Sequence, residues 1–198
     1  MHGFDQIRQI VIPEHLYTQL LEHARRKLAG TYLPDEEAAP KAYGLLGGRM
    51  RGDGIVITNV FPLRRNLRQS AQYKSYIDQL MAEVAVASVT PLDKRGWVSD
   101  PREVLAAEEE CESVGSTLLG GYHMHRIAWE HDPRRDSCTE LDTRLAEDSR
   151  LWAFILSMVD PVRPVLCAFF EGDNAKPVPV RVGAADDAVD ATNHGVRR

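Results

Sequence analysis

The chain has 198 residues, of which 43% are hydrophobic and 27% charged, and its formal net charge is −5. This composition is typical of a globular protein with a sizeable core, so we expect one domain over residues 1–182 and a flexible tail over residues 183–198. The acidic balance and the lack of a long basic stretch argue against nucleic-acid binding. The 3 cysteines are far apart, and neither a secretory signal nor an apolar run of membrane length is present, so we expect a cytoplasmic protein that does not contact a membrane.

The first predicted elements are a short strand and an amphipathic helix. In residues 7–12 isoleucines alternate with other residues as in a strand, and Pro13 then suits the first turn of a helix. Apolar residues four positions apart predict that this helix covers residues 14–29. His15 and His23 lie off the apolar stripe, so we expect both on the exposed face of the helix.

A hairpin, an insertion and a second helix are predicted next. Residues 41–48 and 55–61 form two strands connected by a glycine-containing turn. Residues 67–96 have helical spacing in their first half but fit the plan of the domain poorly, so we interpret them as an insertion or lid. Asp100, which precedes a proline, and Glu103 have the spacing of a capping box, so another helix should begin here.

The second half of the chain is predicted to supply most of the sheet. Residues 118–125 read as a buried central strand that ends in two histidines. Thr139 is a good N-cap for the helix that follows. Residues 151–159 and 165–170 read as two further core strands, and residues 177–182 as an edge strand.

The two histidines and an aspartate of the following helix form a candidate metal site. Residues two apart in a strand share one face, so His123 and His125 should point the same way. Asp142 lies in the first turn of the helix that Thr139 opens, from where its carboxylate can turn toward both imidazoles. Two histidines, one aspartate and an open fourth position are typical of catalytic Zn²⁺.

The order of these motifs resembles the JAMM (MPN) family of zinc metallopeptidases, which includes deubiquitinases and bacterial enzymes that trim ubiquitin-like or sulfur-carrier proteins. The stretches that carry the resemblance are residues 43–48 (YGLLGG), 55–63, 98–110 and 121–125 (GYHMH). Together they span most of residues 7–171. The resemblance implies an α/β fold: a single three-layer domain with a mixed central β-sheet flanked by helices, similar to that of cytidine deaminases.

The resemblance also implies a role for each residue of the site. His123, His125 and Asp142 would hold Zn²⁺, and the hydroxyl group of Thr139 would donate a hydrogen bond to the oxyanion. The usual family spacing selects Asp136 as the third ligand instead. We prefer Asp142, because Thr139 then supplies the expected hydroxyl three positions earlier and an N-cap as well, at the cost of a longer loop.

Three positions depart from the family pattern. The family usually has Ser between the histidines and Pro after them, where this chain has Met124 and Arg126. More seriously, Lys41 replaces the glutamate that accepts a proton from the attacking water and passes it to the leaving amine. An ammonium group cannot accept a proton. Either another carboxylate serves as the base, or Lys41 is deprotonated, or the site binds zinc without hydrolysis. The carboxylates near enough in sequence are Glu36, Glu37 and Glu130.

The function implied by the resemblance is zinc-dependent hydrolysis of a peptide or isopeptide bond at the C-terminus of a ubiquitin-like or sulfur-carrier-like protein. The alternative is a non-catalytic zinc-binding or scaffold module, because Lys41 replaces the family glutamate. A deaminase is disfavoured, because the Pro-Cys-x-x-Cys half of its zinc site is absent. The sequence leaves open the substrate, the role of residues 67–96, and whether the protein is a monomer or a homodimer.

Overall fold

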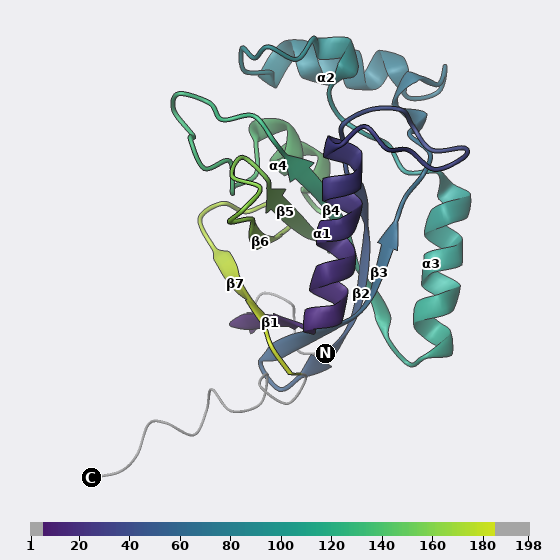
Figure 1. Cartoon of the computed structure of the whole chain (residues 1–198), viewed down its shortest axis with the longest axis vertical. Coiled ribbons are helices and arrows are strands. Elements are labelled where there is room, and N and C mark those ends of the chain that lie inside the picture. The colour runs from purple at the N-terminus through teal and green to yellow at the C-terminus, as the bar shows by residue number, and fades with distance from the viewer. Residues whose placement is uncertain (1–5, 185–198) are drawn as a thin grey trace.

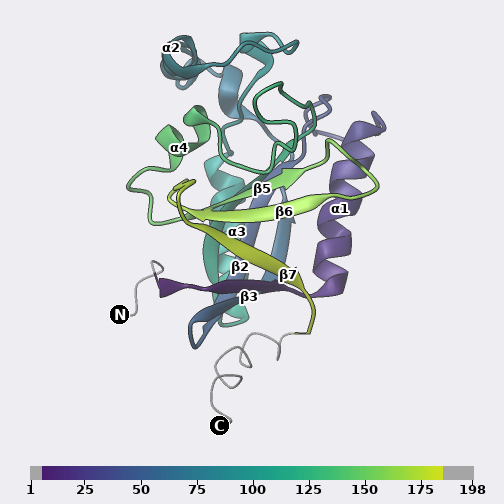
Figure 2. The ribbon, with the colours of Figure 1, turned by 90° about the vertical axis from the view of Figure 1, so that its left-hand side faces the viewer.

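The computed structural model describes residues 6–184, in which the strands close into a barrel in the order β1-β3-β2-β4-β5-β6-β7 (Figure 1, Figure 2). The strands are β1 (Gln9–Ile12), β2 (Tyr43–Arg51), β3 (Gly54–Pro62), β4 (Thr117–His125), β5 (Trp152–Ser157), β6 (Val165–Phe170) and β7 (Pro177–Val182). The helices are α1 (Glu14–Leu28), α2 (Lys74–Val84), α3 (Pro101–Ser113) and α4 (Glu140–Ala146), with short 3₁₀ helices η2 (Leu67–Gln69) and η3 (Leu92–Lys94). The predicted elements agree with these to within a few residues at each end, because the apolar periods were clear. Most of the predicted tail lies outside the described residues.

Closure of the barrel shows that the predicted fold class, an open three-layer domain, was wrong. The sheet is mixed, as expected, but its first and last strands meet: β1 pairs in parallel with β7, with Val11 opposite Arg181. Residues 177–182 do form a strand, yet not an edge strand. Residues 177–179 pair with β6 and residues 180–182 with β1, so β7 changes partner halfway along its length. Its prolines, which lack an N–H group and usually mark an edge, are confined to the half that pairs with β6.

Helices α1 and α3 lie on opposite sides of the part of the barrel formed by β2, β3 and β4 (Figure 1). The principal core fills the space between α1 and the barrel, and a smaller cluster lies beneath α3. Neighbouring side chains of β4 face opposite sides of the sheet. Tyr122 and Met124 belong to the principal core, whereas His123 and His125 face the other way.

The prediction that His23 is exposed was wrong, although His15 is exposed as expected. Only 3% of the His23 side chain is accessible, and its Nδ1 atom lies 2.8 Å from the hydroxyl oxygen of Tyr122. Its Nε2 atom is 3.5 Å from Glu36. Helix α1 therefore buries the polar side chain of His23 as well as its apolar stripe, because Glu36 in the loop that follows the helix is a polar partner for it.

Helix α3 begins at Pro101 as predicted, but only half of the expected capping box forms. The Asp100 carboxylate accepts a hydrogen bond from the backbone N–H of Arg102 at 3.0 Å. Glu103 does not reach back to the cap; it accepts from the backbone N–H groups of Arg64 at 3.0 Å and Arg65 at 3.2 Å. The two carboxylates thus fasten α3 to the segment that leaves β3.

The insertion at residues 67–96 folds over the end of the barrel where β4 terminates (Figure 1). Ile77 and Met81 of α2 pack against Leu141 of α4, so the insertion is held by apolar contacts beside the predicted metal site. Over residues 6–184, each helix is too short or too polar to cross a bilayer.

Candidate metal centre

The end of β4 presents two imidazole rings to the same side of the sheet. The Nε2 atoms of His123 and His125 are 3.1 Å apart, and the ring centroids are 4.9 Å apart. Tyr122 and Met124 alternate with them and point into the principal core. The predicted common face of the two histidines is confirmed.

Asp142 reaches the two histidines from the first turn of α4. Thr139 is the N-cap of this helix and forms a capping box with Asp142: its hydroxyl oxygen accepts from the Asp142 N–H at 3.3 Å, and Asp142 Oδ2 accepts from the Thr139 N–H at 2.7 Å. The Thr139 hydroxyl also donates to Oδ2 at 2.7 Å. The other oxygen, Oδ1, lies 3.2 Å from Nε2 of His123. The helix cap therefore holds the carboxylate beside both imidazoles, with Oδ1 nearer His123 and Oδ2 3.6 Å from Nε2 of His125.

The spacing of these atoms fits a single small cation. The donor atoms of His123, His125 and Asp142 all lie within 4.8 Å of one another. In a tetrahedral Zn²⁺ site with bonds of about 2.0–2.1 Å, the ligand atoms are roughly 3.3–3.4 Å apart. The closest separations here are 3.1 Å between the two Nε2 atoms, 3.2 Å from His123 Nε2 to Oδ1 of Asp142, and 3.6 Å from His125 Nε2 to its Oδ2, which are close to that value. The three residues therefore fit zinc, with room for a further ligand on the cavity side.

A hydrogen bond outside the triad determines which nitrogen of His125 faces the other two ligand groups. Nδ1 of His125 lies 3.0 Å from the carbonyl oxygen of Arg135 and donates to it, which leaves the lone pair of Nε2 for a metal. Only 8% of the His125 side chain is exposed. Burial lowers the pKa of His125, which favours the neutral ring that metal binding needs.

The surroundings of the part-buried Asp142 favour its ionised form. Burial by itself raises the pKa of a carboxyl group, but His123 and His125 beside it hold the pKa of Asp142 well below its usual range. Its ion-pair partners among the described residues are these two imidazoles, and no lysine or arginine of residues 6–184 joins them. Asp142 is thus a carboxylate that has no internal cation other than the histidines.

Two residues close in sequence to Asp142 do not join the triad. Asp136 accepts a hydrogen bond from Nε of Arg134 at 2.8 Å in the loop between β4 and α4, and its carboxylate is not among the converging atoms. Cys138 is buried against Ile155, and this burial raises the pKa of its thiol. The structure therefore brings Asp142 to the histidines and leaves Asp136 and Cys138 apart.

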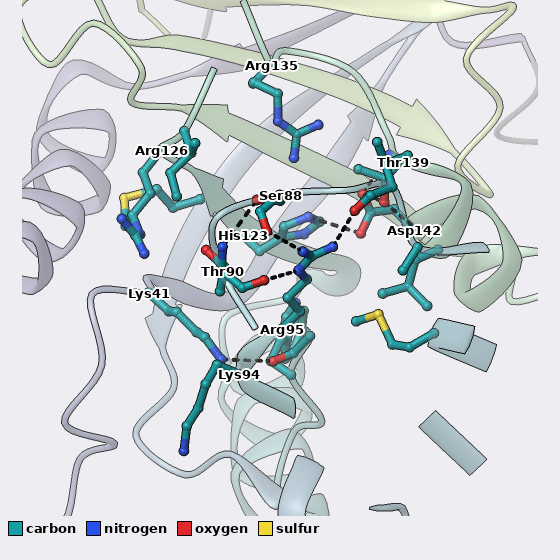
Figure 3. Close-up of a pocket in the computed structure, with 18 of the residues that line it drawn as sticks. Lys41, Ser88, Thr90, Lys94, Arg95, His123, Arg126, Arg135, Thr139 and Asp142 are labelled. Atoms are coloured by element: carbon teal, nitrogen blue, oxygen red, sulfur yellow. Dashed lines mark hydrogen bonds and ion pairs between the residues drawn. The ribbon is translucent and has the colours of Figure 1, made fainter. Parts of the chain in front are cut away.

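His123 and Asp142 of the triad line a cavity of about 180 Å³, the cavity of the triad, whose opposite wall is the end of the insertion (Figure 3). Trp97 stacks on Tyr43 with 5.2 Å between ring centroids and lies 6.4 Å from the His123 ring. The guanidinium group of Arg95 shapes the adjoining loop by donating to three backbone carbonyls, those of Val86, Ser88 and Thr90 at 2.5, 3.1 and 2.7 Å. Sequence reasoning missed this wall, because hydrogen bonds to backbone carbonyls leave no periodic signal.

Lys41 lies in the same cavity. Its Nζ atom donates to the carbonyl oxygen of Gly96 at 3.3 Å and lies 3.9 Å from a carboxylate oxygen of Glu37. The cavity wall therefore carries an ammonium group that is held toward the insertion (Figure 3).

The carboxylates proposed as substitutes for the family glutamate do not line this cavity. Glu36 is only 1% exposed and is bound by Arg26 at 2.5 Å and Lys27 at 3.5 Å. Glu37 accepts hydrogen bonds from the Tyr43 hydroxyl at 3.2 Å and from an Asn66 amide at 3.0 Å. Glu130 is an exposed residue of the loop after β4. Within the described chain, Asp142 is the one carboxylate that lines the cavity of the triad.

Comparisons with known proteins add evidence on the fold. No protein-family model matches the chain. No curated protein matches it either. Among solved structures, the chain is similar to the solution structure of protein DSY2949 from Desulfitobacterium hafniense, with 24% identity, a TM-score of 0.57, and coverage of 96% of this chain and 100% of that chain. At this identity the likeness supports the architecture of the chain and leaves its function to the geometry of the site.

Proposed function

We propose that the protein is a zinc-dependent hydrolase of the JAMM type that cleaves a peptide or isopeptide bond. The observation that carries this proposal is the convergence of two imidazole nitrogens and one carboxylate oxygen at the wall of a cavity. Zn²⁺ held by His123, His125 and Asp142 would polarise the scissile carbonyl and lower the pKa of the attacking water to about 7.

Lys41 supplies the proton that the leaving amine needs. Breaking an amide bond requires a proton on the departing nitrogen, and an ammonium group can donate one. Burial and the surrounding cations lower the pKa of Lys41, although Glu37 acts in the opposite direction, so Lys41 is a better acid than an exposed lysine. The family glutamate both accepts and donates a proton; Lys41 performs the second of these steps. A water whose pKa is near 7 is partly deprotonated at neutral pH without a carboxylate.

Thr139 acts as a positioning residue. It holds Asp142 through the capping box and through its hydroxyl group, which donates to Oδ2 at 2.7 Å. A hydroxyl group has one proton, so Thr139 can donate to an oxyanion, as the family resemblance implies, only after it turns away from Asp142. The contacts of Thr139 therefore favour a role in orienting the ligand.

The acyl part of the substrate is the C-terminus of a small protein of the ubiquitin-like or sulfur-carrier-like class. A cavity of about 180 Å³ accommodates the end of an extended chain rather than a folded surface.

The cysteines Cys111, Cys138 and Cys167 are all free, which supports a cytoplasmic location.

A second candidate function is a non-catalytic module that binds zinc and a partner protein. The specific observation in its favour is that no carboxylate of residues 6–184 besides Asp142 lines the cavity, so the proton acceptor typical of the family has no replacement there. This candidate predicts the same metal affinity as the hydrolase but no turnover.

The two candidates differ in what happens to substrates with different leaving groups. We expect zinc-loaded protein to hydrolyse both a peptide amide and the matching nitrophenyl ester, whose leaving group departs without a proton. Lys41→Met should lower amide hydrolysis by about 10²–10⁴-fold and leave ester hydrolysis nearly unchanged. The control is Lys176→Met. It removes a lysine whose side chain is 84% exposed and which lines neither the cavity of the triad nor the adjoining cavity beside Lys41.

Other outcomes reject parts of the proposal. Zinc binding without hydrolysis of either compound indicates the non-catalytic module. Equal losses on amide and ester show that Lys41 does not serve as the acid. Failure to bind zinc rejects both candidates.

A further inference from the structure

The cavity of the triad is strongly cationic in a protein that is acidic overall. Its charged lining residues are the carboxylate of Asp142 and five cations, Lys41, Lys94, Arg95, Arg126 and Arg135. The formal net charge of the whole chain is −5, so this concentration of positive charge is local. A bound metal ion would increase it further. Such a cavity attracts an anionic ligand and repels a cationic one.

Two of the five cations have their guanidinium groups occupied by the protein. The guanidinium group of Arg95 donates hydrogen bonds to the backbone carbonyls of the cavity wall. Arg135 stacks on Trp129, with 3.4 Å from its Cζ atom to the ring centroid, and one nitrogen lies 3.5 Å from Asp132. Arg95 therefore contributes charge and shape, whereas Arg135 contributes charge and a stacking contact, and its buried Nε atom has no hydrogen-bond partner in the described part of the chain.

The side-chain N–H donors of Arg126 and Lys94 are available to a ligand. Arg126 follows the triad residue His125 directly, and within residues 6–184 no hydrogen bond or ion pair engages its side chain. Lys94 is 71% exposed, and its one ion-pair contact is at 3.9 Å, with its sequence neighbour Asp93. Arginine and lysine donors placed together without protein partners form the usual recognition site for a carboxylate or phosphate group.

The same residues connect the cavity of the triad to a second one. Lys41, Lys94 and Arg126 line both cavities, and the second also includes Glu37 and Pro40 of the loop before β2. The three cations therefore lie where the two cavities share their lining. Figure 3 shows Lys41 between Arg126 and Lys94. A substrate that reaches from the metal ligands past Lys41 must pass Arg126 and Lys94.

We infer that Arg126 and Lys94 form an anion subsite, and that the substrate bears a carboxylate or phosphate group on its leaving amine. The inference rests on the proposed function, in which Lys41 donates a proton to the leaving nitrogen. A group attached to that nitrogen lies next to Lys41, where Arg126 and Lys94 are also found. The leaving group is therefore an amino acid, a short acidic peptide or a phosphorylated amine rather than a neutral or basic one.

Binding of small probes tests the subsite without any requirement for turnover. The full-length zinc-loaded protein is titrated calorimetrically with N-acetylglycine, with the uncharged N-acetylglycinamide, and with inorganic phosphate. We expect N-acetylglycine or phosphate to bind and the amide not to bind. The stronger of the two anions identifies the group as a carboxylate or a phosphate. If neither anion binds, or if the amide binds as well as the acid, the inference is wrong.

Single substitutions then locate the binding. Arg126→Met and Lys94→Met should each weaken binding of the better anion by about tenfold, because each removes charge-assisted hydrogen bonds. Arg126→Lys should weaken it less, since the charge remains. Lys176→Met, which removes a positive charge outside both cavities, should have no effect. Equal affinity in all of these variants would place the anion elsewhere and overturn the inference, and circular dichroism establishes that each variant is folded.

Titration of an Asp142→Asn variant separates this inference from the proposed function. That variant lacks one of the three metal-ligand groups, so an anion that binds only to a metal ion is lost from it. Binding that persists there and still depends on Arg126 supports the subsite even if the protein proves not to be a hydrolase. Binding that disappears shows that the metal alone holds the anion.

Discussion

Two clusters of histidine and carboxylate lie on opposite faces of β4, and they differ in how their charges are balanced. On the α1 side, His23 contacts Tyr122 at 2.8 Å and Glu36 at 3.5 Å. On the other side, His123 and His125 contact Asp142 at 3.2 and 3.6 Å. Both clusters are largely buried, and both would be found by a search for histidines close to acidic residues.

The difference between them is the presence of cations. Arg26 and Lys27 form ion pairs with Glu36, so the negative charge of the α1 cluster is balanced by cations of the protein itself. Asp142 has no arginine or lysine partner among the residues described, and its free oxygen faces the Nε2 atom of His123. A buried carboxylate needs a compensating positive charge. The α1 cluster is therefore a structural ion network, whereas the triad is suited to an external cation.

The largest expected effect is loss of metal binding on substitution of Asp142. Asp142→Asn should reduce zinc affinity by more than the roughly 10–100-fold that loss of a residue hydrogen-bonded to a ligand typically costs. Competition with a chromophoric chelator measures this affinity. Asp136→Asn is the matched control and should bind zinc as the unsubstituted protein does, because Asp136 is paired with Arg134. The reverse result would identify Asp136 as the ligand.

The second prediction concerns stability and the α1 cluster. Glu36→Gln should lower the free energy of unfolding by about 3–5 kcal/mol, because it leaves the buried Lys27 and the neighbouring Arg26 without their common counter-ion. Urea denaturation measures the change, and zinc affinity should stay the same. Glu140→Gln, which breaks an exposed pair with Arg144, should cost less than about 1 kcal/mol. Equal effects of the two substitutions would contradict the structural role of the cluster.

The third prediction is a dependence of stability on pH. Burial lowers the pKa of His23 from 6.5 to about 4, so between these pH values the unfolded chain binds a proton that the folded chain does not. The contribution of His23 is therefore fully present above pH 6.5 and is lost as the pH falls toward 4, by roughly 2–3 kcal/mol in total. Urea denaturation of metal-free protein across this range should show a shallower decline for His23→Gln. Identical slopes would mean that His23 does not titrate as its burial implies.

The smallest expected effect is that of Thr139→Val. The substitution removes the helix cap, which typically costs about 1 kcal/mol of stability, and the hydroxyl group that orients Asp142. Zinc affinity should fall by roughly 10–100-fold, less than for Asp142→Asn. Thr139→Ser retains the hydroxyl group and should restore both properties. An unchanged metal affinity in the valine variant would show that Asp142 does not depend on its cap.

Sequence reasoning located most elements of the fold, because their signals are local. Alternation along β4 placed both histidines on one face, and the N-cap pattern at Thr139 placed Asp142 at the start of α4. It misplaced His23, whose partners come from a loop and from the far strand β4. It also gave Glu103 to a capping box, whereas that carboxylate binds the backbone after β3.

The positions of the strands and helices, and the residues that can ligate a metal, can be read from the amino-acid sequence alone, since they follow from side-chain period, capping and donor chemistry. The pairing of β1 with β7 that closes the barrel cannot, because such pairing uses backbone groups that every residue carries. Only the tertiary structure brought Lys41, Lys94 and Arg126 to the junction of two cavities. Contacts between residues far apart in the chain depend on the path of the backbone, which no local pattern encodes.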